Sequence, residues 1–247
     1  MQYPQYQPPV KLIAAIAVST LINNRRSFVR DSRLALEGVI PPVRYIGLEN
    51  LPKQGPFLML MNHYSRPGFM VLWGALALSA CLPGEPLWMM TRAWTSLGSW
   101  WDKPKRFLTS TIFKRLAQVY GFITTPPMPP EAQDALERAM SVRKLLQTVR
   151  TNHNSIVALA PEGRDIPGGV LGEPPAGGGK LIGQLAGMLH TCIAVGVYEE
   201  QGRLCVSFGE AFELPETLDA RDDIKVSEFV MRRIAVQLPA SMCAGFE

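Results

Sequence analysis

Phe57-Leu58-Met59-Leu60-Met61-Asn62-His63-Tyr64-Ser65-Arg66-Pro67-Gly68-Phe69 is a stretch in which an apolar run ends abruptly in an Asn-His pair. A short apolar run of this kind predicts a buried strand over residues 57–61. Pro67 presets φ for a first helical turn and Ser65 can cap it, so we expect a helix over residues 69–82. The turn between strand and helix presents His63, which is either a structural or a catalytic histidine.

A second strand end carries charged residues. The apolar residues 155–160 predict another buried strand, and Pro161-Glu162-Gly163-Arg164-Asp165 follows it directly. Strands and helices alternate along the chain, which predicts an α/β domain with a mostly parallel central sheet and helices on both faces. The other expected strands cover residues 43–46, 87–90, 120–125, 191–198 and 204–208, and the helices cover residues 107–119, 131–150 and 180–189. Because the carboxyl ends of parallel strands meet at one sheet edge, we expect both charged turns there.

The amino-terminal region differs from the rest of the chain. Residues 10–22 are apolar, and arginines follow at positions 25, 26, 30 and 33. The apolar run is too short to span a bilayer, so it is either an amphipathic helix in the membrane interface or a helix packed on the domain. The arginines favour an anionic lipid surface. We therefore expect a membrane-associating segment over residues 1–38 and an α/β domain over residues 39–247 that folds without residues 1–33.

Composition narrows the class of protein. The chain has 247 residues, 47% of them hydrophobic, and a net charge of +4, which fits one α/β domain with an anionic substrate or membrane surface as partner. No arginine-rich block suggests nucleic acid. The four cysteines are scattered without C-x-x-C spacing, which is typical of reduced thiols in the cytoplasm. Trp94, Trp100 and Trp101 either pack in the core or line an apolar groove.

Several common site motifs are missing. The cluster Gly177-Gly178-Gly179-Lys180 is not a P-loop, because Pro174 stands where a glycine is needed and Leu181 where serine or threonine is needed. The chain contains no G-x-S-x-G motif, so the sequence does not indicate a serine hydrolase. The three histidines lack metal-binding spacing, so we expect no metal site.

With both charged turns considered, the chain resembles the glycerolipid acyltransferases, the family of lysophosphatidic acid acyltransferases, over roughly residues 43–214. The order of several short blocks carries this resemblance: residues 47–52, Asn62-His63 as the start of an Asn-His-x4-Asp block, Gly121-Phe122-Ile123, Pro161-Glu162-Gly163-Arg164 and residues 191–197. Two positions depart from the family pattern. Gly68 stands where the family has its aspartate, and Thr124-Thr125-Pro126 stands where the second block ends in arginine.

The resemblance implies that His63 is a general base, which takes a proton from an acceptor hydroxyl as that oxygen attacks an acyl thioester. The aspartate that Gly68 replaces would orient the ring and stabilise the imidazolium. Another carboxylate must take this role in an active enzyme. Glu162 and Asp165 are the candidates because they lie on the turn at the same sheet edge, and we include Glu162 with His63 in the catalytic set.

We also expect substrate contacts by Asn62, Gly163 and Arg164, which lie in the blocks that carry the resemblance, and by Arg66 and Lys180, which lie outside them. The planar guanidinium of Arg164 matches phosphate oxygens, and Arg66 beside the histidine offers the same group. Lys180 lies at the start of a helix behind a glycine loop. The alternatives are a surface salt bridge for Arg164, a solvated side chain for Arg66 and a helix-face charge for Lys180.

These inferences predict an O-acyltransferase that is cytoplasmic and peripheral on the membrane. It would move a fatty acyl group from acyl-CoA or acyl carrier protein to the hydroxyl of a lysophospholipid or a glycerol phosphate. It would need no cofactor besides that thioester co-substrate. The alternative is a non-catalytic protein that retains the fold and binds acyl chains or anionic lipid.

Overall fold

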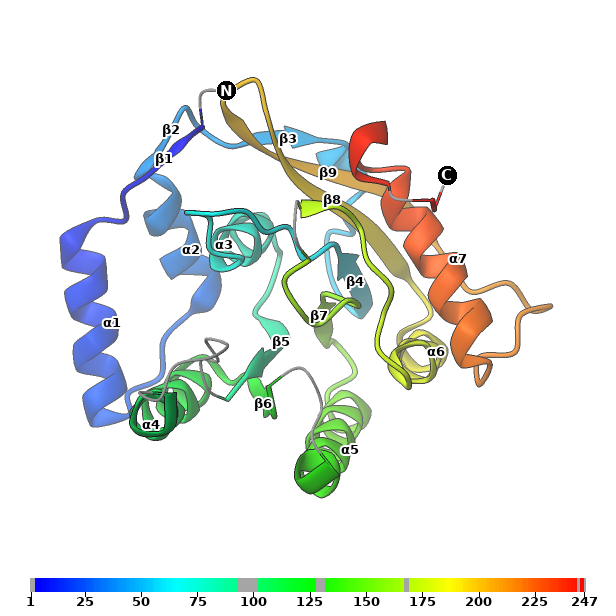
Figure 1. Cartoon of the computed structure of the whole chain (residues 1–247), viewed down its shortest axis with the longest axis horizontal. Coiled ribbons are helices and arrows are strands. Elements are labelled where there is room, and N and C mark those ends of the chain that lie inside the picture. Colours follow the sequence, from blue (N-terminus) through cyan, green and yellow to red (C-terminus); the bar gives the residue numbers. More distant parts are fainter. Residues whose placement is uncertain (1–2, 93–101, 128–131, 167–168, 244, 247) are drawn as a thin grey trace.

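The computed structural model describes residues 3–92, 102–127, 132–166, 169–243 and 245–246, and residues 94, 100 and 101 of the tryptophan-rich segment lie outside them. A seven-stranded sheet with the order β3-β9-β8-β4-β7-β5-β6 forms the centre of the described part (Figure 1). Its strands are β3 (Arg44–Ile46), β4 (Phe57–Met61), β5 (Pro86–Thr91), β6 (Ile123–Thr125), β7 (Ile156–Leu159), β8 (Cys192–Glu200) and β9 (Arg203–Phe212).

The sheet is mostly parallel, as the sequence predicted. Strand β4 lies in parallel register between β7 and β8, with Leu58 opposite both Val157 and Cys192. Strands β5 and β6 continue the parallel part beyond β7. Strand β9 turns back antiparallel along β8, and β3 pairs parallel with β9. The carboxyl ends of β4 and β7 are therefore neighbours, which brings together the two turns that carry His63 and Glu162.

Helices cover both faces of this sheet (Figure 1). They are α1 (Val10–Ile22), α2 (Phe28–Leu36), α3 (Leu72–Ala80), α4 (Asp102–Tyr120), α5 (Ala135–Thr151), α6 (Gly178–Leu189) and α7 (Asp223–Ala235). Successive side chains of β4 point to opposite faces. Phe57 and Met59 join one core with residues of α2, α3 and α4, whereas Leu58 and Leu60 join a second core with residues of α5, α6 and α7. The expected α/β class, with helices on both faces of the sheet, is confirmed.

Several short elements complete the described chain: β1 (Gln5–Tyr6), β2 (Val39–Ile40), η1 (Leu48–Asn50), η2 (Ala132–Asp134) and η4 (Ala240–Met242). Strand β1 pairs antiparallel with β2. Among all described helices, none is long and apolar enough to cross a membrane.

The helix after His63 begins later than predicted. It starts at Leu72 rather than at residue 69, because residues 66–69 form a tight turn in which the Phe69 N–H donates to the Arg66 carbonyl over 3.0 Å. Gly68 has a φ of +81° in this turn. That left-handed conformation favours glycine and ends any helical path through Pro67. Gly68 is therefore a turn residue, and not part of a first helical turn.

The amino-terminal helices are integrated into the domain. Helix α2 buries Phe28, Val29 and Ala35 in the core that also contains Phe57. The amphipathic helix of this region is α2, since α1 is apolar on nearly all sides and buries only three residues. This packing argues against the expectation that the domain folds without residues 1–33, because their removal would expose one side of the core.

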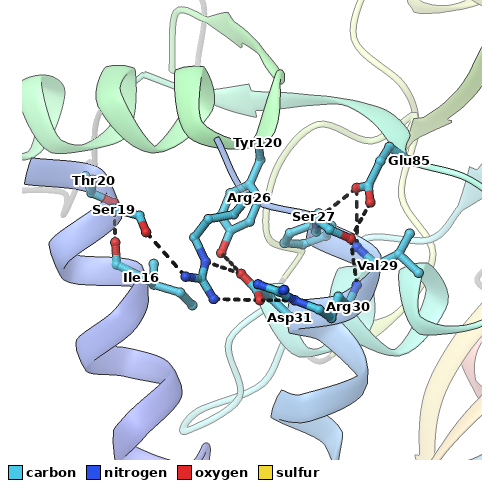
Figure 2. A network of polar contacts seen from close by, with 11 residues as sticks. Ile16, Ser19, Thr20, Arg26, Ser27, Val29, Arg30, Asp31, Glu85 and Tyr120 are labelled. Atoms are coloured by element: carbon cyan, nitrogen blue, oxygen red, sulfur yellow. Dashed lines mark hydrogen bonds and ion pairs between the residues drawn. The ribbon is translucent and has the colours of Figure 1, made fainter. Parts of the chain in front are cut away.

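A buried ion pair fastens these helices (Figure 2). Asp31, which is 1% exposed, accepts hydrogen bonds from Arg26 Nε over 2.5 Å and Nη2 over 2.8 Å. The Tyr120 hydroxyl of α4 donates to the same carboxylate over 2.9 Å. Arg26 also reaches Ser19 Oγ of α1 over 3.3 Å. One carboxylate thus joins α1, α2 and α4.

Contacts within the fold engage arginines that the sequence predicted to face an anionic lipid surface. Arg26 binds Asp31, and Arg33 donates to the carbonyl of Ala80 over 2.9 Å. Arg30 is exposed, and its Nε lies 3.7 Å from Asp31 Oδ1. Three of the four arginines therefore have partners within the fold, and together the four do not form a free basic surface.

We predict that Asp31→Ala lowers the free energy of unfolding by about 3–5 kcal/mol, because it leaves the largely buried Arg26 guanidinium without its carboxylate. Tyr120→Phe removes one hydrogen bond and should cost only about 1 kcal/mol. Urea unfolding of both variants measures the difference. A loss below 1 kcal/mol for Asp31→Ala would contradict a buried network.

Candidate active site

His63 and Asp165 face one another at the carboxyl edge of the sheet. His63 follows β4, and its Nδ1 atom lies 3.2 Å from Oδ1 of Asp165, which lies on the turn after β7. Nδ1 is buried, and Asp165 approaches it at ion-pair distance, without a hydrogen bond of standard geometry among the described residues. The adjacent histidine lowers the pKa of Asp165. Asp165 is therefore the carboxylate that faces the ring.

Glu162 lies behind the histidine and not beside its ring. Its carboxylate is 1% exposed and accepts hydrogen bonds from the backbone N–H of His63 and, over 2.7 Å, from that of Gly172. Burial raises the pKa of Glu162, and these two hydrogen bonds oppose that effect. The sequence placed Glu162 in the catalytic set, but the structure makes it a positioning residue, because it is buried and holds the backbone of the His63 turn.

Asn62 is also occupied within the protein. Its side chain is 2% exposed; Nδ2 donates to the Val197 carbonyl over 2.8 Å, and Oδ1 accepts from the Val197 N–H over 2.6 Å. The side-chain amide therefore makes the two hydrogen bonds that a backbone peptide group would make, and it continues the pairing of β4 with β8 beyond Met61. The expected substrate contact of Asn62 is wrong, because both ends of its amide are used.

Arg66 does not offer a free guanidinium. It makes a forked ion pair with Glu199, in which Nη2 lies 2.7 Å from Oε1, and Glu199 is only 3% exposed at the end of β8. The hydroxyls of Tyr6 and Tyr64 donate to the same carboxylate over 2.6 and 3.0 Å. Burial raises the pKa of both tyrosines, so both stay protonated donors. The expected phosphate contact of Arg66 is therefore wrong; the sequence signal we missed was Glu199 at a strand end.

Arg164 is the cation that remains available at this edge. It is exposed, and no ion pair or hydrogen bond occupies its side chain within the described residues. Gly163 precedes it with a φ of +62°, and its N–H donates to the Ala160 carbonyl over 3.0 Å. Gly163 thus shapes the turn that places Glu162 inside the protein and Arg164 at the surface.

Lys180 lies in the first turn of α6, where the carboxylate of Asp223 binds the free backbone N–H groups of the helix. The Asp223 carboxylate accepts from the backbone N–H of Gly177 over 2.7 Å and of Lys180 over 3.0 Å. These backbone donors, that of Gly177 first, lower the pKa of Asp223. The glycine loop is therefore a capped helix start, and the geometry favours the helix-face alternative for the exposed Lys180 side chain. Within the described residues, no group of His, Cys, Asp or Glu side chains is placed to hold a metal ion.

We predict that Glu162→Gln lowers the free energy of unfolding by about 1–3 kcal/mol, because an amide NH₂ would face one of the two backbone N–H groups. Glu173→Gln is the matched control: Glu173 is exposed on the same loop and should change stability by less than about 0.5 kcal/mol. Thermal or urea unfolding distinguishes them. Equal stabilities of the two variants would show that the buried carboxylate does not hold this turn.

Known proteins resemble this chain in fold and in family. Curated proteins give no match to the sequence. The fold is similar to the crystal structure of the 1-acyl-sn-glycerophosphate (LPA) acyltransferase PlsC from Thermotoga maritima, with a TM-score of 0.53 and 11% identity over 90% of this chain and 86% of that chain. At this identity the likeness shows the fold alone. Residues 42–197, more than half of the chain, match the family described as Acyltransferase. The chain therefore belongs to the acyltransferase family.

Proposed function

We propose that the protein is an O-acyltransferase that moves a fatty acyl group from acyl-CoA or acyl carrier protein to the hydroxyl of a lysophospholipid or a glycerol phosphate. Family membership supports acyl transfer in general. The observation that carries the proposal is the 3.2 Å approach of Asp165 Oδ1 to His63 Nδ1. A histidine backed by a carboxylate is the arrangement that a general base for a hydroxyl nucleophile needs.

In the proposed reaction, Nε2 of His63 takes the proton of the acceptor hydroxyl. The oxygen attacks the thioester carbonyl carbon, the tetrahedral intermediate collapses, and the C–S bond breaks. The imidazolium then returns the proton to the leaving thiolate. Asp165 orients the Nδ1–H and stabilises the imidazolium, and Arg164 binds a phosphate oxygen of a substrate.

In this proposal Asp165 replaces the aspartate that the resemblance would place at position 68. The usual carboxylate comes from the same turn as the histidine, five residues further along the chain. Here the carboxylate comes from the turn after the neighbouring strand, β7. Both routes lead to the same chemistry, because only the position of the oxygen next to Nδ1 matters.

The proposed location is peripheral, on the cytoplasmic face of an anionic membrane. The support is the exposed apolar surface of α1, where Val10, Leu21 and Ile22 are 80%, 71% and 67% exposed. A surface helix with side chains of this kind gains free energy by entering the membrane interface.

We predict that Asp165→Asn lowers kcat by about 10²–10⁴, because the ring loses the carboxylate that orients it and balances its charge. The Asp165 side chain is 73% exposed, so the variant should fold normally. Glu216→Gln removes an exposed charge elsewhere and should leave kcat unchanged. Transfer of labelled acyl groups from acyl-CoA and acyl carrier protein to a panel of lysophospholipids and glycerol 3-phosphate measures this.

An unchanged kcat in Asp165→Asn would sink the assignment of Asp165. No transfer by the wild type to any acceptor would sink the enzyme itself. Lipid binding that survives His63→Ala, together with no turnover, would then favour the non-catalytic lipid-binding alternative.

We predict that Gly68→Asp does not raise turnover, because a carboxylate already faces the His63 ring. The substitution should cost about 1 kcal/mol of stability, since a residue with a Cβ is strained at the φ of +81° found there. Gly68→Ala is the matched control for strain without charge. A large gain in kcat for Gly68→Asp alone would mean that the wild-type ring lacks an effective partner.

A further inference from the structure

A basic pocket lies outside the proposed active site, and neither His63 nor Asp165 lines it. It has a volume of about 680 Å³ and is formed by the connection between α1 and α2, by α4, by the turn into β6 and by α5. Three cationic side chains line it, Arg25, Lys114 and Lys144, and no carboxylate does. Neutral polar groups complete the lining: Asn23, Gln118, Thr124 and Thr148. This composition suits an anion with several oxygen acceptors.

The pocket and the proposed active site lie on different strands of the sheet. The strand residues of the pocket are Leu87 of β5 and Ile123 and Thr124 of β6. His63 follows β4, and two strands, β7 and β5, lie between β4 and β6. The pocket is therefore a separate site, and its ligand would not contact the reacting atoms.

The position of the Arg25 guanidinium depends on a neighbouring glycine, Gly121. Gly121 has a φ of +76°, and a Cβ added there would lie only 2.8 Å from Arg25 Nη1. Glycine therefore permits both the turn into β6 and the close approach of the guanidinium. Lys114 belongs to α4 and Lys144 to α5, and Arg25 belongs to the connection between α1 and α2, so the three cations reach the pocket from three different segments.

Nearby acidic side chains do not neutralise these cations. Asp134 and Glu137, at the start of α5, both bind Arg92, and Asp31 of α2 binds Arg26. Within the described residues, Arg25, Lys114 and Lys144 make no ion pair, and all three are exposed. Their charges are thus available to an incoming anion.

Exposed apolar residues lie close in the chain to residues that line the pocket. Leu21 and Ile22 end α1 immediately before Asn23, and Arg115 of α4 donates to the Leu21 carbonyl over 3.2 Å, which fixes this end of α1 against α4. On α5, Met140 is 62% exposed one helical turn before Lys144. An anionic group with apolar chains attached would satisfy both the cations and these apolar residues.

We propose that this pocket binds the phosphate headgroup of an anionic phospholipid in the membrane, with these apolar residues entering the acyl layer. The inference rests on the proposed membrane location and names the group that the membrane supplies. It does not depend on acyl transfer, and binding rather than turnover tests it.

The test compares vesicles of phosphatidylcholine with vesicles that also contain phosphatidylglycerol, by co-sedimentation of the full chain. Lys114→Gln/Lys144→Gln should weaken binding to the anionic vesicles about 25-fold, about fivefold for each cation near the surface. Lys53→Gln/Arg203→Gln removes two exposed cations beside the other end of the sheet and should bind like the wild type. Equal binding by both double variants would contradict the assignment of the pocket as the headgroup site, but it would not contradict the membrane location.

Two further arms separate a lipid from a soluble phosphate. Leu21→Ser/Ile22→Ser should weaken vesicle binding but leave the binding of glycerophosphoglycerol, the soluble headgroup, unchanged. Binding of glycerophosphoglycerol or inorganic phosphate to the pocket as tightly as the lipid would overturn the lipid assignment. If the wild type binds no anionic vesicle, the membrane location falls together with this inference.

Discussion

The buried carboxylate of Glu162 connects the two turns on which the site depends. It accepts the backbone N–H of His63 at the end of β4 and that of Gly172 beyond β7. A buried carboxylate persists only when such donors replace its water. Because β4 and β7 are adjacent, this one group sets how the turn of His63 lies against the turn of Arg164 and Asp165. The geometry of the proposed catalytic site is thus built on a backbone contact.

Two further buried carboxylates, Asp31 and Glu199, attach the amino-terminal region to the rest of the domain. Asp31 ties α1, α2 and α4 together, and Glu199 ties the turn after His63 to Tyr6 of β1. Helix α1 therefore keeps its apolar side chains outside while its carboxyl end is held firmly. In our account, a helix that contacts the membrane is joined directly to the domain that binds the substrate, without a flexible linker between them.

The sequence was sufficient to predict the sheet, because apolar runs mark buried strands. It was also sufficient to predict that the turn of His63 lies next to the turn of residues 161–165, because parallel strands end at one edge of the sheet. It was insufficient for individual side chains. The partners of Asn62 and Arg66, Val197 and Glu199, lie more than 130 residues away. Nothing local shows that these polar groups satisfy each other. Likewise, only the path of the turn decides that Asp165, and not Glu162, faces the ring.

The central claim is that Asp165 holds the His63 ring with its proton on Nδ1. Nitrogen NMR of the histidine rings at a pH where they are neutral reports directly which nitrogen carries the proton, and His63→Gln assigns the signal. We expect the wild-type ring to be protonated on Nδ1 with Nε2 free, and Asp165→Asn to shift the balance towards Nε2–H. The same proton distribution in both proteins would contradict the account.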